Sequence, residues 1–349
     1  MKNMIIYYLK KRWYVILAIT IIILFLNIVT IDPDYFISNR YIYEGVPNDY
    51  IVVPQADAAP IGYMTLFACI LATIIPMFEF YFKMRKVSID QLYSLPIKRE
   101  KIYLTKYIIG LIETLIPLII NYLVIILIVA LSEHMFDFKY IILYLPVLLG
   151  LTVVLYTIVS FVYTRGNSYF DGIINVFLYT FILVLPIALL ASWNIDKNAG
   201  WSWFFTYSPL TCAFRIFENL IENRSSSFNG WDLTTFILFT ILAIISFISL
   251  LKLNKLDKSE NSMQISESWF SYKVMLPTYC VLGSMLARES IIIVILIFIS
   301  TFLGYVIYKR TFKLTKKELL FIGLLYFISI LMAISSELIY EAINSSQNY

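Results

Sequence analysis

The sequence predicts an all-α integral membrane protein, and three observations lead to this fold class. The chain is 60% hydrophobic and only 14% charged, whereas a soluble globular domain is about 25% charged. Its mean hydropathy is +0.80. Apolar runs recur along the chain at the length of about 20 residues that crosses a bilayer as a helix, with room for about six to nine of them.

The first 251 residues are expected to form a six-span unit. The first apolar run is too long for the core of a signal peptide and lacks a small-residue cleavage site, so we expect an uncleaved span. Asp32, Pro33 and Asp34 end this run. The six expected spans are 13–31, 61–82, 107–131, 140–163, 173–193 and 233–251.

Residues 252–349 are expected to form a second domain, with a polar cytoplasmic linker and two to three further membrane segments. Within it, 274–308 is either one long crossing or a hairpin of a short and a long crossing. Arg288 and Glu289 interrupt this stretch, and a charge at mid-bilayer costs at least about 2.5 kcal/mol. The sequence therefore favours the hairpin, with a last span at 318–340.

The distribution of Lys and Arg predicts the orientation, because cytoplasmic loops carry the positive excess. A cytoplasmic N-terminus places most of the 27 basic residues of the chain on the cytoplasmic side. Two long loops, 32–60 and 194–232, then lie outside. The first of them contains five acidic residues against Arg40 alone.

The densest basic cluster follows the second span. Its seven members are Lys83, Arg85, Lys86, Lys98, Arg99, Lys101 and Lys106. A loop of this kind either grips anionic lipid head groups or docks on a protein partner.

The same loop has a pattern of short helices. Ser88 begins a capping box, and Ile89, Leu92 and Tyr93 follow at helical spacing, so one face is apolar. Pro96 stops the helix. We expect a short amphipathic helix, a kink, and a second helix that enters the membrane. Lipid contact explains the basic residues but not a capped helix with an apolar face.

This loop resembles the first cytoplasmic loop of ABC-2 type transporter permeases, the membrane-spanning subunits of bacterial ABC exporters. The residues that carry the resemblance are Asp90, Leu92, Ser94, Leu95, Pro96, Arg99, Lys106 and Gly110. The family often has Ser or Thr where this chain has Lys98. The six-span unit agrees with the core topology of the family, and the longer tail resembles members linked to the export of amphipathic peptides, peptide toxins or antimicrobials.

The resemblance implies that the loop 83–106 holds a coupling helix, which docks into a separate ATPase subunit. The implied coupling residues are Ser88, Asp90, Leu92, Tyr93, Leu95, Pro96, Arg99 and Lys106.

The loop 194–232 contains a second amphipathic pattern. Ser208 and Pro209 are a cap residue and a first helical residue. Apolar residues then recur at three- and four-residue spacing, which predicts a helix at the outer leaflet. Its apolar face includes Leu210, Phe214, Phe217 and Ile221. Permeases that this chain resembles have an external re-entrant helix before span 6; the alternative is a passive interfacial helix.

Polar residues inside the expected spans are candidates for function. Glu79 lies near the cytoplasmic end of the second span, and Glu113 lies about 9 Å into the third, at 1.5 Å per residue. Asn121 follows two turns later. These three residues are expected to line a cavity or an interface; for Glu79 a local ion pair with Lys83 is the alternative.

Several functions are excluded by missing residues. The chain has no GxxxxGK[ST] motif to cradle nucleotide phosphates, so ATP and Mg²⁺ would bind the partner ATPase, and no cofactor is expected on this chain. Its one histidine, His134, cannot build an imidazole-rich metal site. The three cysteines are widely spaced and are expected to be apolar filler. We therefore expect no enzyme.

Two functions of different classes follow from these patterns. The first is the permease of an ATP-driven exporter in the bacterial cytoplasmic membrane, which moves a hydrophobic or amphipathic substrate, such as a peptide. Its expected partners are two ATPase copies, a second permease of the same or a related kind, and lipid, but no nucleic acid. The alternative is a non-transporting sensor or immunity subunit that binds a peptide at its outer surface.

Overall fold

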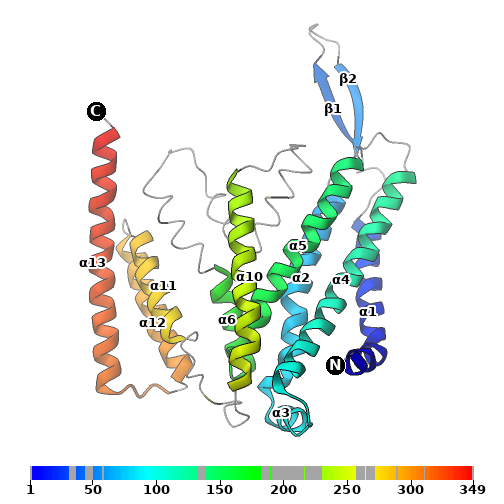
Figure 1. Ribbon diagram of the computed structural model, residues 1–349. Coiled ribbons are helices and arrows are strands. Elements are labelled where there is room, and N and C mark those ends of the chain that lie inside the picture. The colour runs from blue at the N-terminus through cyan, green and yellow to red at the C-terminus, as the bar shows by residue number, and fades with distance from the viewer. Residues whose placement is uncertain are drawn as a thin grey trace. The chain divides into compact units, whose positions relative to one another are not determined.

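A computed structural model shows a helical, multi-pass membrane protein with one β-hairpin (Figure 1). It describes residues 2–30, 37–43, 50–56, 59–131, 138–181, 189, 216, 230–256, 264, 272–287, 290–309 and 311–347. Seven helices in these ranges are long and apolar enough to cross a membrane. They run over Asn3–Ile28, Gly62–Met84, Arg99–Ile128, Ile142–Tyr163, Leu233–Lys255, Ile291–Lys309 and Lys316–Ala342.

The chain folds into two compact units that do not follow chain order. The first comprises Met1–Phe80, Leu92–Phe161 and Cys212–Leu256, and the second comprises Tyr81–Gln91, Val162–Thr211 and Asp257–Tyr349. The predicted division into 1–251 and 252–349 stays a prediction.

Helix α4 (Arg99–Leu131) is the centre of the first unit. It contacts α1 (Lys2–Thr30), α2 (Ala59–Phe80) and α10 (Gly230–Leu256). Its buried residues include large aromatic and aliphatic side chains, which removes apolar surface from contact with lipid and gives dense packing. These residues include Ile102, Tyr103, Ile109, Leu118 and Tyr122.

Hydroxyl groups join other helices of the same unit. On α2, Thr65 shares a 2.7 Å hydrogen bond with Tyr144 of α5 (Phe138–Tyr163). On α4, Tyr107 shares a 2.7 Å hydrogen bond with Thr157 of α5. Polar hydrogen bonds of this kind hold membrane helices together where the hydrophobic effect does not.

The predicted loop 32–60 contains a β-hairpin that the sequence analysis missed. Strands β1 (Ile37–Tyr43) and β2 (Tyr50–Ala56) pair antiparallel, from Tyr43 opposite Tyr50 to Ile37 opposite Ala56. The strands are rich in Tyr, Ile and Val, which favour extended structure. The hairpin projects from the end of the first unit at which α1 ends and α2 begins (Figure 1).

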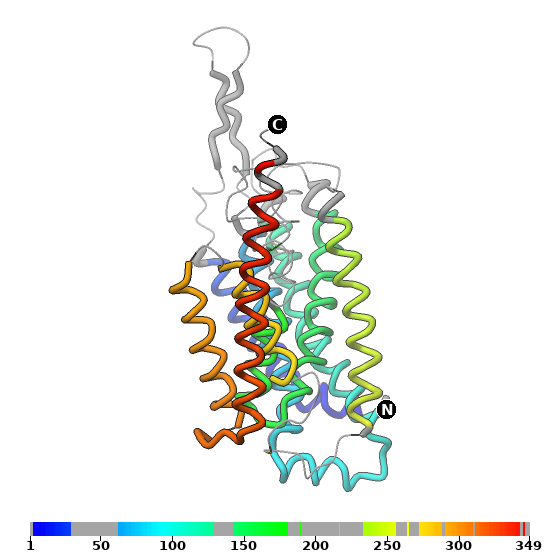
Figure 2. Tube along the Cα trace, turned by 90° about the vertical axis from the view of Figure 1, so that its left-hand side faces the viewer, coloured from blue at the N-terminus to red at the C-terminus, as the bar shows by residue number. Residues whose placement is uncertain are grey.

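The C-terminal region of the second unit is a group of three helices, in which α11 and α13 run in the same direction. Helix α11 (Tyr272–Leu286) contacts both α12 (Ile291–Lys309) and α13 (Lys316–Gln347). The turn between α12 and α13 is seen at the lower end of Figure 2, in orange. Two helices that pack side by side therefore occupy the stretch 274–308. Only α12 is long enough to cross a membrane, so the predicted hairpin of two crossings stays a prediction.

Small residues bring α11 close to α13. Cys280 Sγ lies 3.4 Å from Ser329 Oγ, and Ser336 donates a 3.2 Å hydrogen bond to the carbonyl of Met285. Ser284 donates to the carbonyl of Cys280 at 2.7 Å. Close backbone approach through Ser, Cys and Gly is typical of helix pairs in membranes. Cys280 acts here as a small buried residue, as predicted.

Only the start of the predicted fifth span is described. Helix α6 (Tyr169–Phe181) begins four residues earlier than expected, after Ser168, whose Oγ accepts a 3.3 Å hydrogen bond from the amide of Asp171. The predicted external helix, with Leu210, Phe214, Phe217 and Ile221, lies outside the described residues. So do His134 and Cys212.

Candidate functional site

The basic loop forms two short helical elements before α4. A 3₁₀ turn, η2 (Tyr81–Met84), continues α2, and α3 (Lys86–Tyr93) follows directly. The prediction that Ser88 caps this helix is wrong. The amide of Ile89 already bonds to the carbonyl of Arg85 at 3.0 Å, so Ser88 lies inside the helix, because η2 leads into α3 before the capping box is reached.

Helix α3 has a buried and an exposed face. Ile89 is 1% exposed, and Leu92 and Tyr93 are half-buried, so the predicted apolar face points inward. Five exposed residues of α3 and of the turn that follows it are called the α3 stripe below. Val87, Asp90 and Gln91 lie on α3, and Ser94 and Leu95 lie in the turn after Tyr93.

The turn at Pro96 is fixed by three side chains. The guanidinium of Arg99 lies 4.4 Å from the ring centroid of Tyr93, a cation–π distance. The hydroxyl of Tyr93 is 3.1 Å from that of Tyr103. Arg99 and Tyr93 therefore hold the turn that follows α3; the docking role that the resemblance implies for them stays a prediction.

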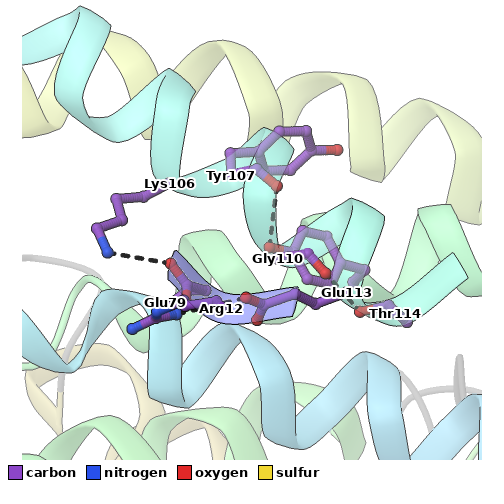
Figure 3. A network of polar contacts seen from close by, with 8 residues as sticks. Arg12, Glu79, Lys106, Tyr107, Gly110, Glu113 and Thr114 are labelled. Carbon is purple, nitrogen blue, oxygen red and sulfur yellow. Dashed lines mark hydrogen bonds and ion pairs between the residues drawn. The ribbon is translucent and has the colours of Figure 1, made fainter. Parts of the chain in front are cut away.

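Directly inside this loop, four ionisable side chains from three helices form a buried cluster, called the ion cluster below. Lys106 Nζ on α4 donates a 3.2 Å hydrogen bond to Glu79 Oε2 on α2. Arg12 on α1 forms an ion pair with Glu79 and a longer one, at 3.6 Å, with Glu113 Oε1 on α4. Figure 3 shows Glu79 between the ends of Lys106 and Arg12, with Glu113 beside Arg12.

Burial makes these contacts strong and mutually dependent. Glu79 is 1% exposed, Glu113 3% and Lys106 6%. Uncompensated charges at such sites cost several kcal/mol each, so they persist only as pairs. The cluster holds two formal positive and two formal negative charges, and Lys106 Nζ also lies 4.6 Å from the ring centroid of Tyr8.

Gly110 allows the helices to meet at this cluster. A Cβ at this position would collide with the hydroxyl of Tyr156 and would lie 2.8 Å from Glu79 Cγ. That hydroxyl donates a 3.1 Å hydrogen bond to the carbonyl of Tyr107. A larger residue would therefore force Tyr156 or Glu79 to shift where α2, α4 and α5 approach each other, which gives a physical reason for Gly110 in the sequence pattern.

Asn121 lies two turns beyond Glu113 on α4 and contacts α1. Its Nδ2 donates to the carbonyl of Pro117 at 2.8 Å and to that of Thr20 at 3.3 Å. On α1, Asn27 Nδ2 lies 3.4 Å from Met64 Sδ of α2. Of the three predicted polar residues, Glu79 and Glu113 therefore meet in one cluster, and Asn121 lies in the adjoining α1–α4 interface.

Sequence analysis missed Arg12, which joins the two carboxylates. It was counted only as part of the basic N-terminus. Two features of the sequence indicate a pair of Arg12 with Glu79. Arg12 lies directly before an apolar run, and it is predicted to lie on the same membrane side as Glu79. Lys83 was the alternative ion-pair partner predicted for Glu79. In the structure, Lys83 Nζ donates to the carbonyl of Thr164.

The described residues contain no group of three His, Cys, Asp or Glu side chains that is arranged to hold a metal ion. No family model, curated protein or solved structure matches this chain. Function must therefore be inferred from its own residues.

Proposed function

We propose that this chain is the membrane subunit of an ATP-driven exporter, with a coupling surface on α3 that receives movement from a separate ATPase. The observation that carries the proposal is a short helix with an exposed stripe, inserted between two helices that share the ion cluster. The α3 stripe offers Val87 and Leu95, 67% and 41% exposed, around polar Asp90 and Gln91. Exposed apolar side chains with a polar rim are typical of protein–protein contacts.

The connection from α3 to the spans is short in the chain. Glu79 lies two residues before η2 begins, and Lys106 lies two turns after α4 begins. Because Glu79 bonds to both Lys106 and Arg12, a displacement that reaches α2 or α4 would act on α1, α2 and α4 together. This arrangement suits the transfer of movement from a partner to membrane helices.

The ATPase would bring the nucleotide and Mg²⁺. A second permease, of the same or a related kind, completes the exporter that the resemblance implies, with amphipathic peptides as the substrate class. The basic end of the unit, with α3, would face the bacterial cytoplasm, and the hairpin end would face outward.

Association with the ATPase tests this proposal. The chain is expressed together with each candidate ABC ATPase from the same cell, and the complex is purified through a tag on the permease. Val87→Asp and Leu95→Asp should each reduce ATPase recovery at least about tenfold, because an aspartate in a desolvated contact costs more than 1.4 kcal/mol. Phe312→Asp is the matched control, since Phe312 is 82% exposed and lies outside α3.

Equal recovery with all three variants would refute the coupling surface. Recovery of the ATPase without export of any peptide in cells would instead favour a non-transporting subunit.

The hairpin supports that second candidate, since β1 and β2 pair only with each other among the described residues, and its flanking segments are acidic. A free strand edge can bind an extended peptide by backbone hydrogen bonds.

A further inference from the structure

The turn between α5 and α6, residues 164–168, is largely buried. Thr164 is 0% exposed and Arg165 is 6% exposed, and Gly166 is buried as well. Turns between helices ordinarily run over the surface of a protein, because their backbone groups need the hydrogen bonds that water supplies. The contacts of this turn therefore identify what replaces water there.

Two close backbone contacts join the turn to α6. A Cβ on Gly166 would lie 2.6 Å from the backbone nitrogen of Gly172. A Cβ on Gly172 would lie 2.7 Å from the ring of Tyr163, the last residue of α5. The amide of Gly166 also donates a 3.1 Å hydrogen bond to the carbonyl of Tyr163. The end of α5, the turn and the start of α6 are therefore one closely packed piece.

Lys83 of η2 brings a cation to this turn. Its Nζ donates to the carbonyl of Thr164, and Lys83 is 5% exposed. Thr164 directly follows α5, and the carbonyl end of a helix lacks intrahelical partners and carries a partial negative charge. An ammonium group is therefore favoured at this point. Because a buried ammonium has lost its water, its hydrogen bond to Thr164 is costly to break.

The 3₁₀ turn η2 also contacts the start of α6 and continues into α3. The rings of Tyr81 and Tyr169 lie 5.7 Å apart at 86°, an edge-to-face arrangement, and Tyr169 is the first residue of α6. Two residues after Lys83, the carbonyl of Arg85 accepts a 3.0 Å hydrogen bond from the amide of Ile89 on α3. A displacement of α3 therefore reaches Lys83 along the backbone.

We propose that Lys83 is a positioning residue that carries a displacement of α3 to the α5–α6 turn. The proposal rests on the proposed function, because the movement that it carries enters from the ATPase at α3. The ion cluster joins α1, α2 and α4, whereas Lys83 adds α5 and α6 to the helices that respond. In this role Lys83 contacts neither nucleotide nor substrate.

The test measures hydrogen–deuterium exchange of the full-length chain in lipid nanodiscs, without ATPase or nucleotide. Lys83→Met removes the cation. It should speed exchange of the amides of Arg165 and Gly166 at least about tenfold, the loss expected for one hydrogen bond to a charged group. Lys83→Gln keeps a neutral donor and should give a smaller increase.

Two further variants separate this role from a general loss of charge or packing. Lys83→Arg keeps the charge and the donors, so exchange in the turn should stay slow. Lys101→Met is the matched control, since Lys101 lies exposed on α4. It removes the same charge and should leave exchange in the turn unchanged.

A substitution in α3 tests the transmission itself. Asp90→Pro breaks α3 from within, and Asp90→Gly weakens it more mildly. With Lys83 present, either change should speed exchange in the turn as well as in α3. In the Lys83→Met background, either change should speed exchange in α3 alone, because the connection is already lost. The effects of the two substitutions on the turn should therefore be less than additive.

Exchange in the turn that is unaltered by Lys83→Met, or that rises equally in Lys101→Met, would overturn the role of Lys83. If the Asp90 variants affect the turn equally in both backgrounds, or in neither, no displacement passes from α3 through Lys83. No ATPase is present in this assay, so its result is independent of whether the α3 stripe binds one.

Discussion

The close approach at Gly110 makes a quantitative prediction about the core of the first unit. In Gly110→Ala the new methyl group would overlap the Tyr156 hydroxyl and would stand about 0.6 Å inside ordinary contact with Glu79 Cγ, at 2.8 Å instead of 3.4 Å. Overpacking of this kind costs about 1–3 kcal/mol. Alanine returns up to about 1 kcal/mol through helix propensity, so we expect a net loss of about 0–2 kcal/mol.

A second substitution separates this collision from other effects. Tyr156→Phe alone loses the 3.1 Å hydrogen bond to the Tyr107 carbonyl, at a cost of about 1 kcal/mol. In the double variant the hydroxyl is gone and part of the collision is relieved. The two changes should therefore cost about 1 kcal/mol less together than the sum of their separate costs.

The assay is unfolding in mixed detergent and SDS, followed by tryptophan fluorescence. Gly150→Ala is the control, since a Cβ there meets nothing nearer than Phe236 Cζ at 3.8 Å; it should be neutral or slightly stabilising. If Gly110→Ala stabilises the protein, or if the two substitutions are additive within about 0.5 kcal/mol, the proposed packing of α2, α4 and α5 is refuted.

Three further predictions concern charge, helix packing and orientation. Glu79→Gln should destabilise the protein by about 3–5 kcal/mol in the same assay, because it leaves buried Lys106 unpaired. Glu100→Gln at the surface should cost no more than about 1 kcal/mol. Similar losses of stability in the two variants would argue against the ion cluster. Ser329→Leu should destabilise the protein by about 1–3 kcal/mol, because it overpacks the α11–α13 contact. Ser300→Leu, on the exposed side of α12, should be tolerated. A larger loss of stability in Ser300→Leu than in Ser329→Leu would contradict the packing of the three helices. In a chain without native cysteines, Val87→Cys should react with thiol reagents only from the cytoplasm and Ser38→Cys only from outside; labelling of both from one side would exclude the predicted orientation.

Hydropathy was sufficient to predict the helical membrane class and the break near residue 288, because a span requires a long apolar run that is visible in the sequence. It also marked Glu79 and Glu113, since ionised side chains in such runs are costly. Their connection through Arg12 was not predictable from local pattern, because the partner lies 67 residues away from Glu79 in the chain and only packing of α1 against α2 and α4 brings it near.

Two local predictions failed for physical reasons. Ser88 has the spacing of a capping residue, but α3 begins two residues earlier, at Lys86, so Ser88 lies within its first turn. The hairpin was not predicted, although apolar and aromatic residues such as Tyr and Ile recur in both β1 and β2, on either side of a Gly- and Pro-containing segment, which is a hairpin signal. The face of α3 was assigned correctly as apolar, but burial of Ile89 shows that it supports the loop instead of forming its outer surface.

The length of α11 has a consequence for how the chain enters the membrane. Its 15 residues extend about 22 Å at 1.5 Å per residue, less than the hydrocarbon thickness of about 30 Å, and they include Pro277 and the hydroxyl of Ser284. Such a segment partitions poorly into lipid by itself during synthesis. The contacts of Cys280, Ser284 and Met285 with α13 form only after some forty further residues have been made, so α11 gains these partners late in synthesis.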